Sequence, residues 1–284
     1  MTRRRGILYV AGALLIIGPP ALWIVSSLPM PIRLPLDAPL VLTAAAAPQI
    51  DIDWAALAER DPLALVRLGR ERYEKNVREY RCVLVKQERL GNKLTDVQTV
   101  ELRYREEPRA VYMLWQDNAD GARRALYLPG QRGYTSDKGE PLARVEPNGA
   151  LARLFVKDTY IPIHGPDARK ASRRAIDEAG FHATFELLEA YNAVAAERGV
   201  LKVHYGGTGV VRGRPTYVIV RDLPYTGPKG PYPDARLILH LDQEWLLPTA
   251  VYSYADHQQK ELLGSYEFKQ VELNPGFGPD AFQF

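Results

Sequence analysis

Two blocks in which apolar and polar residues alternate constrain the fold of this chain more than any other feature. An alternation of period two predicts strands with one apolar face, and turn residues such as Gly91-Asn92 and Asp120-Gly121 separate the segments. The segments are RCVLVKQERL (81–90), VQTVELRYRE (97–106), RAVYMLWQ (109–116), ARRALYLPG (122–130) and RGYTS (132–136), then VLKVHYGG (200–207), GVVRGR (209–214), PTYVIVRD (215–222), ARLILHLD (235–242), LPTAVYSYA (247–255) and ELLGSYEFKQVEL (261–273). The sequence therefore predicts about eleven antiparallel strands.

Two helical segments accompany these strands. Asp61-Pro62 is an N-cap residue followed by proline at the first helical position, and it opens an amphipathic helix. A second helical stretch, within 175–198, ends at Gly199, which is a typical stop. The order helix, five strands, helix, six strands predicts a mainly β (α+β) domain. Its single large curved sheet would carry the helices on the concave face.

The N-terminus predicts a membrane anchor. Residues 6–28 carry no charge and follow Arg3, Arg4 and Arg5, and this length is enough for a helix to cross the hydrocarbon core. The positive-inside rule leaves residues 1–5 in the cytoplasm, so the chain after Leu28 is expected in the periplasm, as part of a single-pass bacterial inner-membrane protein. A cleavable signal peptide is the alternative, and it also exports the domain. Residues 29–60 read as a Pro/Ala-rich linker, and 61–284 as the β domain.

Charge and motifs argue against several functions. Without the three N-terminal arginines, 34 basic residues balance 34 acidic ones, so the sequence does not predict a nucleic-acid binder. The single cysteine, Cys82, excludes an intramolecular disulfide and a cysteine-rich zinc site, and the five histidines have no metal-ligand spacing. The glycine-rich stretch 206–209 lacks the lysine and helix of a phosphate-binding loop and predicts a hairpin turn. We therefore expect no enzyme, no metal and no cofactor. A hydrolase that uses Cys82 is the remaining catalytic alternative.

Two motifs carry a resemblance. The stretch from 237 to 284 has a strand, a Leu247-Pro248 turn, Tyr266-Glu267-Phe268, Asn274 and the final Phe282-Gln-Phe284, and it resembles the closing strands of the LolA/LolB/RseB-type envelope proteins. The stretches YRCVLVKQERLGNKL, YREEPRAVYMLW, RALYLPG and RRAIDEAGF are similar to a bacterial family called domain of unknown function 1571. The positions that match that family's pattern, without an assigned role, are Cys82, Lys86, Glu88, Arg105, Pro108, Tyr112 and Gly130.

The resemblance spans about residues 61–284. It implies an incomplete antiparallel β-barrel whose helices cover a hydrophobic cavity, which in LolA receives lipoprotein acyl chains. This chain departs from LolA, a soluble shuttle, because it carries a predicted anchor. It also lacks the cysteine through which LolB is lipid-anchored.

The function that follows is binding of a lipid, an acylated protein or another apolar ligand, without catalysis. Apolar residues that share strand faces are the candidates for the cavity wall, although such faces also form ordinary protein cores. The candidates are Leu102, Tyr104, Val111, Met113, Trp115, Leu237, Leu239, Leu241, Tyr252, Tyr254 and Phe268. The alternative is a protein-interaction or regulatory module of the cell envelope, of the RseB kind. An exposed apolar edge or a mobile Gly/Pro-rich loop at 223–234 would favour this alternative. In the cavity-bearing fold the same loop is either a lid or a solvated hairpin end.

Overall fold

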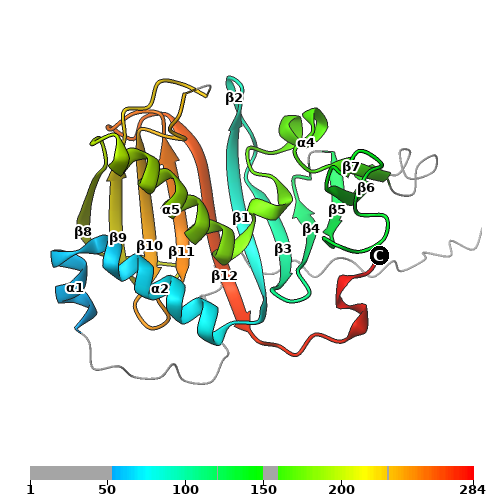
Figure 1. Cartoon of the computed structure of the whole chain (residues 1–284), viewed down its shortest axis with the longest axis horizontal. Coiled ribbons are helices and arrows are strands. Elements are labelled where there is room, and N and C mark those ends of the chain that lie inside the picture. The colour runs from blue at the N-terminus through cyan, green and yellow to red at the C-terminus, as the bar shows by residue number, and fades with distance from the viewer. Residues whose placement is uncertain (1–52, 120, 150–158, 229) are drawn as a thin grey trace, which may run out of the picture. The chain divides into compact units, whose positions relative to one another are not determined.

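The computed structural model describes residues 53–119, 121–149, 159–228 and 230–284, and their strands form one antiparallel sheet (Figure 1). The strands are β1 (Glu79–Leu90), β2 (Lys93–Leu94), β3 (Gln98–Arg105), β4 (Ala110–Asp117), β5 (Ala122–Tyr127), β6 (Leu142–Pro147), β7 (Thr159–Pro162), β8 (Lys202–Val211), β9 (Arg214–Asp222), β10 (Arg236–Asp242), β11 (Pro248–Tyr254) and β12 (Leu262–Leu273). The order is β7-β6-β5-β4-β3-β1-β12-β11-β10-β9-β8, and β2 pairs only with β1. The predicted mainly β, antiparallel fold is confirmed.

The first and last long strands meet in the middle of the sheet. β1 pairs with β12 along most of its length, so Leu84 lies opposite Phe268 and Lys86 lies opposite Tyr266. β7 and β8 are the two ends of the described sheet, which is therefore open. β1 and β3 to β5 come from the first alternating block of the sequence and β8 to β12 from the second, and the β1–β12 pair joins the two halves of the sheet.

Helices cover one face of the sheet. They are α1 (Trp54–Arg60), α2 (Pro62–Asn76), α4 (Pro166–Ala171) and α5 (Gly180–Glu197), with the 3₁₀ turn η1 (Ile176–Glu178). A second 3₁₀ turn, η2 (Pro279–Phe282), belongs to the C-terminal segment. α2 and α5 cross the front of the sheet in Figure 1. Asp61 caps α2 as predicted, because its carboxylate accepts a hydrogen bond from the backbone N–H of Ala64. Leu65 of α2 and Phe181 and Phe185 of α5 enter the main core against the sheet.

The C-terminal segment packs on a second, smaller core. This core contains Tyr112, Leu126 and Phe282, with Phe284 at its margin. Asn274 fixes the start of the segment: its amide oxygen accepts from the backbone N–H of Arg78, and its amide nitrogen donates to the backbone oxygen of Asn76. The tail motif noted in the sequence therefore holds the end of the chain against the sheet.

Three predicted elements were wrong. Residues 132–136 form no strand apart from one isolated bridge at Thr135, and the strands that follow β5 are β6 and β7 instead. Gly206, Gly207 and Gly209 lie inside β8 and not in a hairpin turn; the register shifts there at a bulge, and Gly207 has a φ of +90°. The hairpin turn falls later, at Arg212 and Gly213, which both have positive φ as a tight hairpin requires. Residues 54–60, expected in the linker, form α1.

The predicted cytoplasmic tip (1–5), anchor (6–28) and linker up to residue 52 lie outside the described residues. Within the part of the chain that the structure describes, no helix is long and apolar enough to cross a membrane.

Candidate functional site

A cavity of about 170 Å³ lies between the sheet and the segment that runs from α4 to α5. Its walls are mostly apolar. The apolar side chains that line it come from both halves of the sheet and from η1 and α5: Leu84, Met113, Trp115, Ala125, Ala143, Val145, Ile161, Ile163, Ile176, Leu187, Leu188, Leu237, Val251 and Phe268.

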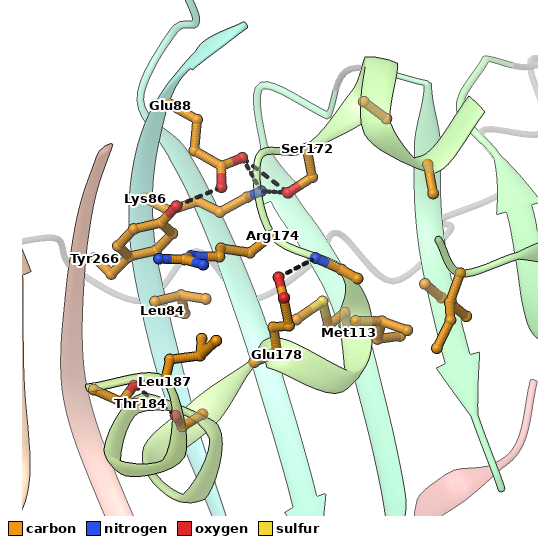
Figure 2. A pocket seen from close by; sticks show the side chains of 18 of the residues that line it. Leu84, Lys86, Glu88, Met113, Ser172, Arg174, Glu178, Thr184, Leu187 and Tyr266 are labelled. Carbon is orange, nitrogen blue, oxygen red and sulfur yellow. Dashed lines mark hydrogen bonds and ion pairs between the residues drawn. The ribbon is translucent and has the colours of Figure 1, made fainter. Parts of the chain in front are cut away.

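A cluster of polar side chains forms one end of the cavity (Figure 2). The Lys86 ammonium lies 2.8 Å from Glu88 Oε2 and donates to Ser172 Oγ at 3.0 Å. Ser172 Oγ in turn donates to Glu88 at 2.9 Å. The Tyr266 hydroxyl donates to the other Glu88 oxygen at 2.7 Å. Glu88 therefore accepts from three side chains, on β1, on β12 and just after α4, and links the sheet to the helical side.

The local sequence explains how two charges come to be buried in the sheet. Lys86 and Glu88 are two residues apart in β1, so they share the face that Leu84 presents to the cavity. Their side chains are only 6% and 2% exposed. A buried ion pair is tolerated when the remaining hydrogen-bonding capacity is satisfied, and Ser172 and Tyr266 provide this for Glu88.

Electrostatics keep this end of the cavity charged. Burial alone would raise the pKa of Glu88, but the charge of Lys86 and the hydrogen bonds from Lys86, Tyr266 and Ser172 outweigh it, and the pKa is lowered. Burial, together with the negative charge of Glu88, raises the pKa of the Tyr266 hydroxyl, which stays protonated as a donor. For Arg174, burial opposes the charged form, but Tyr266, Glu178 and Tyr191 outweigh it and raise the pKa of the guanidinium.

The structure divides the eleven predicted wall residues into three groups. Those that line the cavity are Met113, Trp115, Leu237 and Phe268. Those that are buried in the surrounding main core, and are not among the residues lining the cavity, are Leu102, Tyr104, Val111, Leu239 and Leu241.

The third group, Tyr252 and Tyr254, lies on the opposite face of β11. Because Val251 lines the cavity, its neighbour in the strand points away from it, and the Tyr252 hydroxyl donates to Glu267 on that other face. The core-facing positions of β11 instead carry the smaller residues Thr249, Val251 and Ser253. Ser253 is buried there because its hydroxyl bonds to the backbone oxygen of Gly264. Large aromatic residues were therefore a poor guide to the inner face of β11, and the cavity does not include these two tyrosines.

The polar end was not assigned from the sequence. Lys86 and Glu88 matched the family pattern without a role, and Ser172 and Tyr266 were not proposed as site residues. The sequence did contain one sign of the polar cluster: in β1, Lys86 and Glu88 occupy the strand face on which all the other residues are apolar. Ser172 reaches the cluster because of the path that the chain takes after α4, and the alternation of apolar and polar residues does not indicate this path.

The site offers little chemistry for covalent catalysis. The Cys82 thiol is buried in the main core, and burial raises its pKa, so the thiolate needed for a nucleophile is disfavoured. Ser172 lies beside Lys86, but the ammonium is paired with an ionised carboxylate and is a poor general base. Among the described residues, no group of three or more histidine, cysteine, aspartate or glutamate side chains is placed to hold a metal ion.

Comparison with known proteins gives weak structural likenesses and one family. The chain is similar to MucB of Pseudomonas aeruginosa, solved in complex with MucA (TM-score 0.43, 16% identity, 78% of this chain and 61% of that chain). It is also similar to the Mycobacterium tuberculosis lipoprotein LppX (0.35, 14%, 74% and 93%) and to a LolA superfamily protein from Nitrosomonas europaea (0.28, 7%, 77% and 97%). In a second MucB structure the chain spans 63% of MucB.

No curated protein matches the chain. A family model described as "Protein of unknown function (DUF1571)" matches residues 77–284, which include every strand and all of the polar cluster. The family predicted from the sequence is confirmed: the chain belongs to the DUF1571 family.

Proposed function

We propose that this protein binds the apolar part of a lipid or of an acylated protein in the cavity between the sheet and the α4–α5 segment, without catalysis. In this proposal residues 6–28 tether the domain to a bacterial inner membrane, and the cavity faces the periplasm. The observation that carries the proposal is the cavity itself, whose wall is built of aliphatic, methionine and aromatic side chains. Ligand sites of this kind are mostly apolar and include a few convergent polar groups.

The size of the cavity limits what it holds without rearrangement. An engineered cavity of about 150 Å³ lined by apolar side chains admits benzene. A cavity of about 170 Å³ therefore takes a group of that size, and a whole acyl chain requires one wall to move. The wall formed by α4 and η1 is the one expected to move, because neither element has a buried residue.

Filling the cavity tests the proposal. Ala143 lies on β6 at the cavity wall, and Ala143→Leu places three additional carbon atoms inside it. Ala281→Leu adds the same atoms at the margin of the smaller core and serves as the control. The full chain, held in a non-ionic amphipol, is titrated with a fluorescent fatty acid. We expect Ala143→Leu to weaken binding at least tenfold and Ala281→Leu to leave it unchanged. Failure of the unmodified chain to bind, or equal binding by both variants, would contradict the proposal.

A protein-interaction module is the alternative, and the free edge of the sheet favours it. Among the described strands β8 pairs with β9 alone, and Val210 on this edge strand is 71% exposed. An edge strand with an exposed apolar side chain is suited to accept a strand from a partner. A pull-down that recovers one stoichiometric membrane protein, from cells in which the domain carries no lipid, would favour this alternative.

A further inference from the structure

A second cavity, of about 680 Å³, adjoins the apolar one. Ser172, Arg174 and Ala175, in the segment between α4 and η1, line both cavities, so this segment is a wall common to both. The loop between β9 and β10 also lines the second cavity, with Tyr225 and Tyr232. This loop is anchored, because Tyr232 is buried in a small core of its own.

The second cavity is strongly basic. Its lining includes five basic side chains, Arg89, Arg169, Lys170, Arg173 and Arg174, and one acidic side chain, Glu178. Four of the five bases come from a single stretch of sequence, 169–174. A lining with this balance attracts anions.

Three acids, Asp167, Glu261 and Glu178, lie near these five bases, so a net positive charge remains. Lys170 is paired with Asp167, and Arg89 with Glu261. The side chains of Arg169 and Arg173 donate to backbone oxygens, of His164 and Pro233, and in the described chain neither makes an ion pair with a carboxylate.

Glu178 is itself engaged, since its carboxylate accepts from the backbone N–H of Ala175 at 3.0 Å. Its negative charge also contributes to the raised pKa of the Arg174 guanidinium. Two arginine side chains without a carboxylate partner, beside a third, form a site suited to a phosphate or carboxylate group.

We infer that the ligand is a single anionic amphiphile, whose acyl chain enters the apolar cavity and whose phosphate or carboxylate head lies against Arg169, Arg173 and Arg174. This inference rests on the proposed function, since it names the ligand class for the same cavity. The common wall at 172–175 places the junction of chain and head at the polar cluster of Lys86, Glu88 and Ser172.

Matched ligands separate the contribution of the head from that of the chain. The full chain in a non-ionic amphipol is titrated with dodecyl phosphate, with dodecanol and with inorganic phosphate, and Trp115 at the cavity wall supplies a fluorescence signal. We expect dodecyl phosphate to bind at least tenfold more tightly than dodecanol, and inorganic phosphate to bind far more weakly than either. Equal affinity for the two dodecyl ligands would overturn the inference and leave the proposed function standing. Failure of both to bind would overturn the two together, and tight binding of inorganic phosphate would indicate a free-anion site.

Variants assign the preference to these arginines. Arg169→Gln/Arg173→Gln should reduce the preference for dodecyl phosphate to about threefold or less, with the affinity for dodecanol unchanged. Arg169→Gln alone changes an exposed side chain, and we expect a partial loss of the preference, which remains measurable if the double variant is unstable. Arg132→Gln/Lys138→Gln removes two exposed charges from another loop and should preserve the preference. A double variant at 169 and 173 that folds and keeps the full preference refutes the inference.

Discussion

Removing the charge of Glu88 should destabilise the protein severely. Glu88→Gln keeps the size of the side chain but leaves the Lys86 ammonium, 6% exposed, without its carboxylate. Breaking a buried ion pair from one side costs about 3–5 kcal/mol, because an uncompensated charge remains in the interior. The hydrogen bonds from Tyr266 and Ser172 also lose their charged acceptor. We therefore expect the free energy of unfolding to fall by about 3–5 kcal/mol, a large share of the stability of a typical domain.

The matched control removes both charges. Lys86→Met/Glu88→Gln leaves no buried charge, keeps the shape of both side chains and retains an amide oxygen for the Tyr266 hydroxyl. Replacement of buried pairs by uncharged groups of similar volume is often nearly neutral, so the double variant should recover at least about 2 kcal/mol relative to Glu88→Gln alone. The assay is urea unfolding followed by tryptophan fluorescence, with the slope compared among variants. A loss below about 1 kcal/mol for Glu88→Gln would refute the reasoning that the pair is desolvated.

The same pair has a pH signature. The pKa of Glu88 is lowered in the folded protein, so its contribution to stability is present above the unfolded-state pKa of about 4.3 and is lost as the pH falls through the folded value. The difference in unfolding free energy between the wild type and Glu88→Gln should therefore be constant from pH 8 to 5 and shrink below pH 4. If the difference in unfolding free energy instead grew as the pH fell, the pKa of Glu88 would not be lowered in the folded protein.

Two further predictions concern the packing of α5 on the sheet. The pKa of His182 is raised, chiefly by its hydrogen bond to Glu106, so its stabilising charge is present below about pH 6.5 and is lost at higher pH. In urea titrations, the difference in unfolding free energy between wild type and His182→Gln should therefore be about 1 kcal/mol larger at pH 6 than at pH 9. A difference that does not change with pH would exclude a stabilising His182–Glu106 pair. Gly180 has a φ of +93° and a Cβ there would lie 2.0 Å from the Tyr80 hydroxyl, whereas Gly139 has a φ of +81° and open space. Gly180→Ala should therefore cost about 3 kcal/mol and Gly139→Ala about 1 kcal/mol, and equal losses would show that the contact with Tyr80 is relieved elsewhere.

Local physics predicted much of the sheet. The segment 97–106 alternates because its apolar side chains meet the helices, and β3 covers 98–105. The cap at Asp61 and the turns near Gly91 follow from local rules, and they lie close to where the sequence predicted them. The errors fall where local rules do not decide. β6 and β7 are short strands, and the glycines at 206–209 favour a turn locally but lie inside β8, because the pairing with β9 determines their conformation.

The candidate site shows a similar limit, with one instructive exception. Cavity residues and core residues both come from apolar strand faces, so Leu239 and Leu237 have the same pattern, although only Leu237 lines the cavity. Only the packing of distant segments decides between them. The exception is a charged residue at a strand position where the alternation predicts an apolar one, because such a residue can be recognised in the sequence. Lys86 and Glu88 occupy the core-facing positions of β1, and burial of two charges costs free energy that an aliphatic pair would not.

The cost of that burial bears on how the cavity opens. Ser172 is the partner of the buried pair that lies outside the sheet, and it stands in the wall common to the apolar and basic cavities. Because α4 and η1 bury no residue, the hydrogen bonds of Ser172 to Lys86 and Glu88 are a principal anchor of this wall. A long acyl chain that displaces this wall must therefore break the hydrogen bonds of Ser172 to Lys86 and Glu88, so part of the binding free energy is spent on opening the cavity.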